Sequence, residues 1–153
     1  AANAGVNSDG TIKNDKVGTG AIVDGSIRGS GYAFTPSSVT ISSNNVDEVV
    51  QTLVVSSSGA PLTLTFALSL SCPGNNGANA RARIKRNGTT LYEQGFYLWG
   101  TGTWTDSLSV PIVEAMGVGT YTYTLEVARQ PTMVEIDNVV VKNRSIVNLE
   151  VKR

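Results

Sequence analysis

The sequence contains no histidine, and Cys72 is its one cysteine. Without histidine there is neither a Ser-His-Asp triad nor a Cys-His pair, so these forms of nucleophilic catalysis are excluded. A single cysteine cannot form an internal disulfide, and the chain offers no Cys/His cluster for a metal. We therefore expect no metal and no cofactor, and we interpret Cys72 as a small buried residue at a strand end.

Charge is also scarce: charged residues make up 16% of the chain and cancel to a formal net charge of zero. Nucleic acid is not an expected partner, because domains that bind it are normally basic. No apolar run approaches the roughly 18 residues of a membrane-spanning helix, so membrane insertion is not expected either. The chain opens with Ala-Ala-Asn-Ala and no Met, which we interpret as a piece or mature form of a longer protein.

Alternation of apolar and polar residues dominates the chain from about Val46 to the end, after a transition over residues 34–45 with one short strand candidate. It is clearest in PLTLTFALSLS, where one side of the strand carries Leu62, Leu64, Phe66, Leu68 and Leu70. RSIVNLEVKR places Val147, Leu149 and Val151 on one face and Asn148, Glu150 and Lys152 on the other. GTYTYTLEVAR alternates in the same way, and less regular strands are expected in VVQTLVVS, TDSLSVPIV and TMVEIDNVVVK. The pattern predicts an all-β fold, an antiparallel jelly-roll-like β-sandwich over residues 34–153.

One hairpin is nearly explicit in the sequence. Asn87-Gly88 separates two strand-like runs, and Asn-Gly favours a two-residue type I′ turn because both positions need a positive φ. The implied register pairs Arg86 with Thr89, Ile84 with Leu91, and Arg83 with Tyr92.

Residues 1–33 carry a different pattern. Residues 9–33 divide into five-residue blocks, each with a bulky apolar residue at its fourth place: Ile12, Val17, Ile22, Ile27 and Tyr32. Neither a helix nor a strand places such a set on one side. A small pentapeptide β-helix, a chance pattern in a linker, and an extended segment buried against other chains are the alternatives. We favour the last, because the segment has too little apolar content to order itself.

Two surfaces could bind a ligand. Arg81, Arg83 and Lys85 share one side of a strand, with Tyr92 opposite, and could meet phosphate or acidic sugars. The alternative is a solvated outer face or salt bridges between the chains of a trimer, to Glu93, Glu126 or Glu150. Tyr97, Trp99 and Trp104 could stack on sugar rings or anchor a protein contact, or could instead fill the core or an interface between chains. A weaker third candidate is the loop with Asn75 and Asn76.

Paired carboxylates are the remaining route to catalysis. Glu135 and Asp137 would share a strand face, but we interpret them as a solvated face or a cation site. No catalytic residue is therefore assigned, and the chain is not expected to be an enzyme.

GTIKNDKVGTGAIVDGSI resembles the I-x-x-D-K-V/I…A-I-x-D-G-S-I repeats of tail fibres and tail-tip host-specificity proteins of tailed bacteriophages. NRSIVNLEVKR is similar to the R-S-L-x-x-L-E-x-K-R ending of the same proteins. Between these two motifs the resemblance to the tail proteins is limited to general features, namely Ser/Thr-rich strands, the R-N-G-T-x-L-Y hairpin and the G-x-Y-T-Y-T-L strand. The chain carries one clear copy of the repeat, so a long stem is not part of it.

The resemblance implies a homotrimer with a C-terminal jelly-roll-like head at the distal end of the phage tail, and that residue 153 is the true C-terminus. Its partners would be two further copies of itself, the rest of the tail protein, and a bacterial surface receptor. That receptor would be lipopolysaccharide, another glycan or an outer-membrane protein. Two alternatives stay open: a purely structural head that only folds and registers the trimer, and a carbohydrate-binding module of a secreted bacterial protein.

Overall fold

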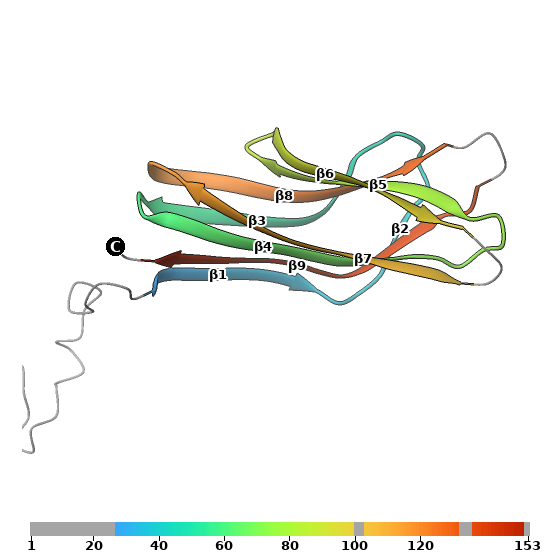
Figure 1. Cartoon of the computed structure of the whole chain (residues 1–153), viewed down its shortest axis with the longest axis horizontal. Coiled ribbons are helices and arrows are strands. Elements are labelled where there is room, and N and C mark those ends of the chain that lie inside the picture. The colour runs from blue at the N-terminus through green and yellow to red at the C-terminus, as the bar shows by residue number, and fades with distance from the viewer. Residues whose placement is uncertain (1–26, 100–102, 132–135, 152–153) are drawn as a thin grey trace, which may run out of the picture.

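The structure is a computed structural model that describes residues 27–99, 103–131 and 136–151. The described residues form nine strands in two antiparallel sheets, packed face to face as Figure 1 shows. The predicted all-β sandwich is confirmed. In the described ranges there is no helix that is long and apolar enough to cross a membrane.

The first sheet has the strand order β1-β9-β4-β7, with the short β2 attached to β9, and the second sheet has the order β3-β8-β5-β6. The strands are β1 (Ile27–Thr35), β2 (Val39–Ile41), β3 (Glu48–Ser58), β4 (Pro61–Cys72), β5 (Ala78–Arg86), β6 (Thr89–Leu98), β7 (Trp104–Ala115), β8 (Val118–Gln130) and β9 (Val139–Val151).

The topology is that of one long hairpin rolled up on itself. Strand β5 pairs with β6, β4 with β7, β3 with β8, and β1 with β9, and each pair is antiparallel. Rolling places the pairs β1–β9 and β4–β7 in the first sheet and the pairs β3–β8 and β5–β6 in the second, which is the jelly-roll arrangement. The first and last strands consequently lie side by side at one edge of the first sheet.

The tip of the rolled hairpin is the predicted turn. Asn87 and Gly88 have φ values of 47° and 83°, as a type I′ turn requires. The Asn87 side-chain oxygen accepts a hydrogen bond from the backbone N–H of Thr122 at 2.8 Å, which fixes the tip on β8.

The expected register of this hairpin holds only beside the turn. Arg86 lies opposite Thr89, but a bulge between Ile84 and Lys85 shifts the remaining pairs by one residue. Ile84 therefore faces Tyr92, and Arg83 faces Glu93. The predicted pairing of Arg83 with Tyr92 is wrong, because the two-residue turn fixes register only as far as the first irregularity.

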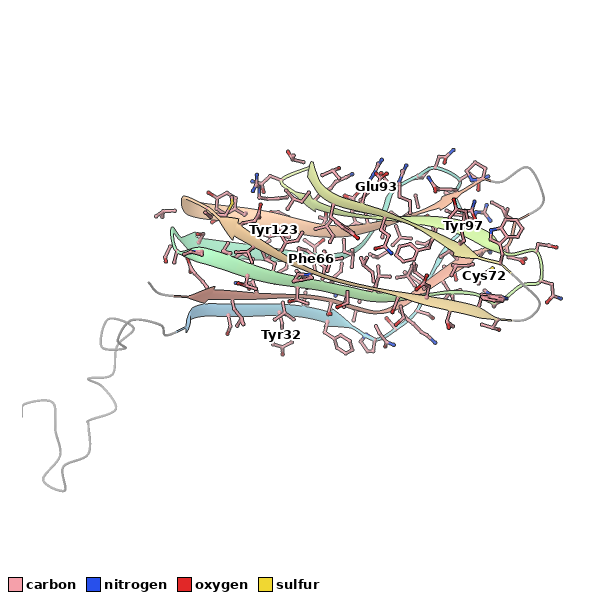
Figure 2. The ribbon with its side chains drawn as sticks, in the orientation of Figure 1. Tyr32, Phe66, Cys72, Glu93, Tyr97 and Tyr123 are labelled. Carbon is pink, nitrogen blue, oxygen red and sulfur yellow. The ribbon has the colours of Figure 1, made fainter. Side chains whose placement is uncertain are left out.

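The core lies between the sheets, and β4 contributes most to it. All five alternating residues of PLTLTFALSLS are buried, as predicted, and so is Cys72 at the strand's end. Phe66 of β4 faces Tyr123 of β8 across the sandwich, with ring centroids 6.2 Å apart (Figure 2). Contacts of this kind join the two sheets.

Strand β9 turns its polar face inward and its apolar face outward, the reverse of the usual pattern. Asn148 and Glu150 are buried, whereas Val147 and Leu149 of the same strand face solvent. The Glu150 carboxylate accepts hydrogen bonds from the backbone N–H groups of Ser58 at 2.7 Å and Ala60 at 3.3 Å. These groups belong to the turn between β3 and β4, so the polar side of β9 has buried partners.

TMVEIDNVVVK and RSIVNLEVKR do not form separate strands. The strand β9 begins at Val139 and continues through both, with an irregularity near Asn143, whose φ is 52°. Residues 136–138 are not part of a strand, and residues 132–135 lie outside the described residues.

The expected boundary at residue 34 falls inside a strand. Ile27 begins β1, and Tyr32 lies within it, opposite Val147 of β9.

Of the five predicted interchain contacts, Ile12, Val17 and Ile22 lie outside the described residues. Tyr32 points away from the sandwich in Figure 2 and is 77% exposed.

Candidate functional site

The three cations of β5 share the outer face of the second sheet, as predicted, but each is paired with an acid of the same chain. Asp47, just before β3, lies 2.8 Å from Arg81 and 2.6 Å from Arg83. Arg83 also binds Glu93 of β6, and Lys85 binds Glu126 of β8 at 2.5 Å each. Salt bridges to Glu93 and Glu126 were expected between the chains of a trimer, but the structure forms them within one chain.

Asp47 is the centre of this charge network, and its role was not anticipated from the sequence. Burial raises the pKa of its carboxyl, but hydrogen bonds from Arg81 and Arg83 and their positive charges outweigh burial, so the pKa lies below its ordinary value. The network is balanced between cations and acids. It offers less free positive charge than the strand sequence suggested.

Tyr92 does not join the cations. It lies opposite the buried Ile84, packs partly against the core, and donates its hydroxyl to the side chain of Gln94 at 2.8 Å. The bulge explains this placement, because the extra residue Leu91 of β6 moves Glu93 into the position beside Arg83.

The aromatic candidates lie at the far end of the sandwich from Ile27, where β6 ends. Tyr97 is 78% exposed on the outer face of the second sheet, and its cross-strand neighbour is Asn79 of β5. The indole N–H of Trp99 donates to the side-chain oxygen of Asn79 at 2.6 Å. This bond brings Tyr97, Asn79 and Trp99 together, and Figure 2 shows Tyr97 at that end of the molecule.

Trp99 is half-buried because its ring covers the backbone at Gly77. A Cβ atom at Gly77 would lie 2.9 Å from the Trp99 ring, and Gly77 has a φ of +74°. Only glycine fits this close approach without strain. Trp99 therefore supports the neighbouring loop, whereas Tyr97 remains open to a ligand.

The loop with Asn75 and Asn76 is shaped by Asp137. One oxygen of Asp137 accepts hydrogen bonds from the backbone N–H groups of Asn76 at 2.7 Å and Gly77 at 3.2 Å. A Cβ at Gly74 would lie only 1.9 Å from the same oxygen, so the loop wraps closely around the carboxylate. The side chains of Asn75 and Asn76 remain exposed on the outside of the loop.

Asp137 thus acts as a structural anchor for this loop. Glu135, its predicted neighbour on one strand face, lies outside the described residues. Asp137 is 60 residues from Gly77 in the sequence, so no local pattern signals the contact. Among the residues with described positions, no group of three or more potential metal ligands of the His, Cys, Asp or Glu type occurs.

Trp104 belongs to the same end of the sandwich but to the other sheet. It begins β7, is 45% exposed, and lies opposite Cys72 of β4. Figure 2 places Cys72 at the same end as Tyr97. The aromatic stretch is thus divided: Tyr97 and Trp99 lie on β6 and just after it, and Trp104 opens the strand of the opposite sheet.

We define the distal site as Tyr97, Asn79, Trp99, Asn75 and Asn76. Its groups are aromatic rings and amides, and the nearby carboxylate of Asp137 is directed at backbone N–H groups. Amides both donate and accept hydrogen bonds, and an aromatic ring has an apolar face with a polar rim. This combination suits a neutral polar ligand with C–H faces, such as a sugar ring.

Comparison with known proteins gives the fold and no family. No family model and no curated protein matches the sequence. A structure of infectious bursal disease virus, Gx strain, has a TM-score of 0.51 at 9% sequence identity, covering 80% of this chain and 32% of the viral chain. That similarity shows a shared fold alone.

Two further structures are similar at lower scores. Dimeric latent PorU from Porphyromonas gingivalis has a TM-score of 0.41 at 11% identity, covering 78% of this chain and 13% of PorU. The enzymatically active domain of tailspike protein 4 from bacteriophage CBA120 has a TM-score of 0.29 at 13% identity, covering 78% and 19%. This chain spans about a third or less of the length of each of the three structures.

Proposed function

We propose that this chain is a non-enzymatic tail-fibre or tail-tip module of a tailed bacteriophage, which adheres to the bacterial surface as a homotrimer. The motifs GTIKNDKVGTGAIVDGSI and NRSIVNLEVKR support the phage origin through their resemblance to tail proteins. The jelly-roll sandwich is compatible with such a head, since the fold occurs in viral surface proteins and lectins.

The observation that carries the proposal is the position of Tyr97. Its ring is 78% exposed at the end of the sandwich opposite Ile27, the residue at which the preceding chain enters β1 (Figures 1 and 2). A module attached through residues 1–26 would present this end outward. An exposed aromatic ring beside fixed amides is a typical anchor for a ligand.

The receptor would be a surface glycan, with lipopolysaccharide as the first candidate and an outer-membrane protein as the alternative. The uncharged distal site favours a neutral sugar over a phosphate, because the cations of β5 are already paired with Asp47, Glu93 and Glu126. Three such sites on one trimer would bind a surface with an avidity far above that of each site.

The proposal is tested by binding the purified full chain to a panel of Gram-negative cells. Purified lipopolysaccharide and isolated outer-membrane proteins then serve as competitors. Tyr97→Ala should lower the affinity of a single site by about tenfold, the loss expected for an aromatic anchor. Val54→Ala is the matched control, because Val54 is exposed on the outer face of the same sheet but towards the other end.

Competition by lipopolysaccharide alone would identify a glycan receptor, and competition by the protein fraction alone would identify a protein receptor. Equal binding by both variants and wild type would remove the distal site from the proposal. No binding to any strain would favour the second candidate function, a purely structural head. That candidate is supported by the exposed apolar side chains on the outer face of the first sheet, such as Tyr32 and Phe34.

A further inference from the structure

The outer face of the first sheet is apolar where a solvated sheet face would be polar. Tyr32 and Phe34 of β1 and Val147 and Leu149 of β9 all point away from the sandwich and are exposed. On β9 this is the reverse of the usual pattern, because Asn148 and Glu150 take the buried side. Exposed apolar patches of this kind mark interaction surfaces.

The strand registers assemble these residues into one continuous surface. Tyr32 lies opposite Val147, and Val147 lies opposite Thr65. The neighbouring row contains Leu149, Thr63 and Val113 in the same way. The surface therefore extends across the sheet from β1 at one edge to β7 at the other.

We call this surface the neutral face, because the side chains that form it carry no charge; the exposed Lys142, opposite Ser69 on the same side of the sheet, lies at its border. Its members are apolar or bear a hydroxyl group: Ser30, Tyr32, Phe34, Thr63, Thr65, Ala67, Ser109, Pro111, Val113, Ser145, Val147 and Leu149. The outer face of the second sheet is the opposite case, with Arg81, Arg83, Lys85, Glu93 and Glu126. The outer face of the second sheet thus carries paired charged groups, whereas the side chains of the neutral face are uncharged.

We propose that the neutral face is the surface through which copies of this chain associate with one another. A charged partner would find no counter-charge on it, whereas a second copy presents the same mixture of apolar groups and hydroxyls. Hydroxyls both donate and accept hydrogen bonds, so one part of this face can bind a different part of the same face on the next copy. Closed rings such as a trimer are built from contacts of this kind between unlike patches of identical chains.

The position of the preceding chain supports a second copy as the occupant. Residues 1–26 lead into β1 at Ile27, and β1 forms one edge of the neutral face. Copies that meet through this face would therefore also meet beside Ile27, the residue that follows the predicted interchain contacts Ile12, Val17 and Ile22 in the sequence.

The inference deepens the trimer that the proposed function assumes, but it does not depend on what the distal site binds. Its first test compares two tyrosines of nearly equal exposure in one copy, Tyr32 at 77% and Tyr97 at 78%. Hydroxyl-radical footprinting of the full chain should modify Tyr97 readily and protect Tyr32 severalfold. The protection should fade on dilution as the copies dissociate.

The second test measures mass by light scattering. The wild-type chain should give a multiple of its monomer mass of 16.1 kDa, and Tyr32→Glu and Val147→Lys should each give the monomer. Val54→Lys is the matched control, since Val54 is exposed on the outer face of the second sheet and should leave the mass unchanged. Circular dichroism shows whether each variant keeps its β-structure.

A monomeric wild-type chain with both tyrosines equally reactive would overturn the inference and assign the face to a different protein. An oligomer whose mass neither Tyr32→Glu nor Val147→Lys changes would overturn it as well, because assembly would then use another surface. Cell binding by Tyr97→Ala reports on the distal site alone, so a failure of receptor binding is distinguishable from a failure of assembly.

Discussion

Tyr123 and Glu114 join the two sheets through the interior of the sandwich. The hydroxyl of Tyr123, on β8 of the second sheet, donates to the carboxylate of Glu114, on β7 of the first sheet, at 2.5 Å. Arg86 of β5 binds the other oxygen of the same carboxylate. Burial first, and the hydrogen bond to Glu114 second, raise the pKa of Tyr123 above its ordinary value.

Removing this hydroxyl should destabilise the fold. Tyr123→Phe keeps the ring against Phe66 but removes a hydrogen bond to a charged group, and the free energy of unfolding should fall by about 1.5–3 kcal/mol. Denaturant unfolding near neutral pH measures the loss. Tyr121→Phe is the control, because its hydroxyl donates to the Gly117 carbonyl at an exposed site. Equal losses in the two variants would contradict a special role for the inter-sheet bond.

The raised pKa of Tyr123 predicts the pH range over which its hydrogen bond to Glu114 contributes to stability. The neutral phenol is favoured in the folded state, so its contribution is complete below the ordinary tyrosine pKa of 10.0 and is lost as the pH rises through the folded-state pKa. The stability difference between wild type and Tyr123→Phe should therefore shrink only in strongly alkaline solution. Denaturant midpoints measured on both proteins across that range test this.

Asp47 should make stability depend on pH at the acid end. Its folded-state pKa lies below the ordinary value of 3.8, so its contribution is present above that value and is lost as the pH falls through the folded-state pKa. Asp47→Asn should be less stable than wild type near pH 6, with the difference shrinking as the pH is lowered towards 2. Urea midpoints at several pH values provide the measurement, and a constant difference would contradict the prediction. The charged groups around Asp47 are Arg81, Arg83, Lys85, Glu93 and Glu126.

Glu150 should be essential to the turn between β3 and β4. Glu150→Ala removes the acceptor of the Ser58 and Ala60 N–H groups, and should lower the free energy of unfolding by about 2–3 kcal/mol. Lys142→Ala, an exposed change on the same strand, should stay within about 0.5 kcal/mol of wild type. A small effect at Glu150 would mean that water replaces the carboxylate as acceptor.

Substitutions at two glycines should distinguish an effect on the shape of the loop from an effect on general stability. Gly74→Ala places a Cβ against the Asp137 carboxylate and should cost about 1–3 kcal/mol and weaken binding at the distal site. Gly95→Ala meets nothing within 4 Å in the middle of β6, and should be neutral or stabilise by up to about 1 kcal/mol. Thermal unfolding and cell binding of both variants test the contrast, and weakened binding in Gly95→Ala would show that the loop is not the cause.

Strand positions and the jelly-roll class could be predicted because they depend on local alternation and turn chemistry. The five apolar residues of PLTLTFALSLS alternate without a break, so they could form only one buried face. The positive φ angles at Asn87-Gly88 follow from the residue types themselves. In these segments the information needed is contained within about ten residues.

The remaining features depend on partners that are distant in the sequence. Alternation in β9 shows two faces but does not show which is inside, and the deciding partner of Glu150 is the backbone of Ser58, 92 residues away. The local sequence of β5 does not show that its cations form ion pairs, because their partner Asp47 lies 34 residues before Arg81. The bulge at Ile84 and the anchor at Asp137 are likewise invisible to a local pattern.

The pairing of the first strand with the last has a consequence for how the fold can be engineered. Ile27 lies directly opposite Val151, so a short turn could join these two residues, and the chain could be opened instead at Asn87-Gly88. Such a circular permutant would keep every strand neighbour of the native sandwich. The strand pairing itself, rather than the order in which the ribosome makes the strands, would then be what specifies this architecture.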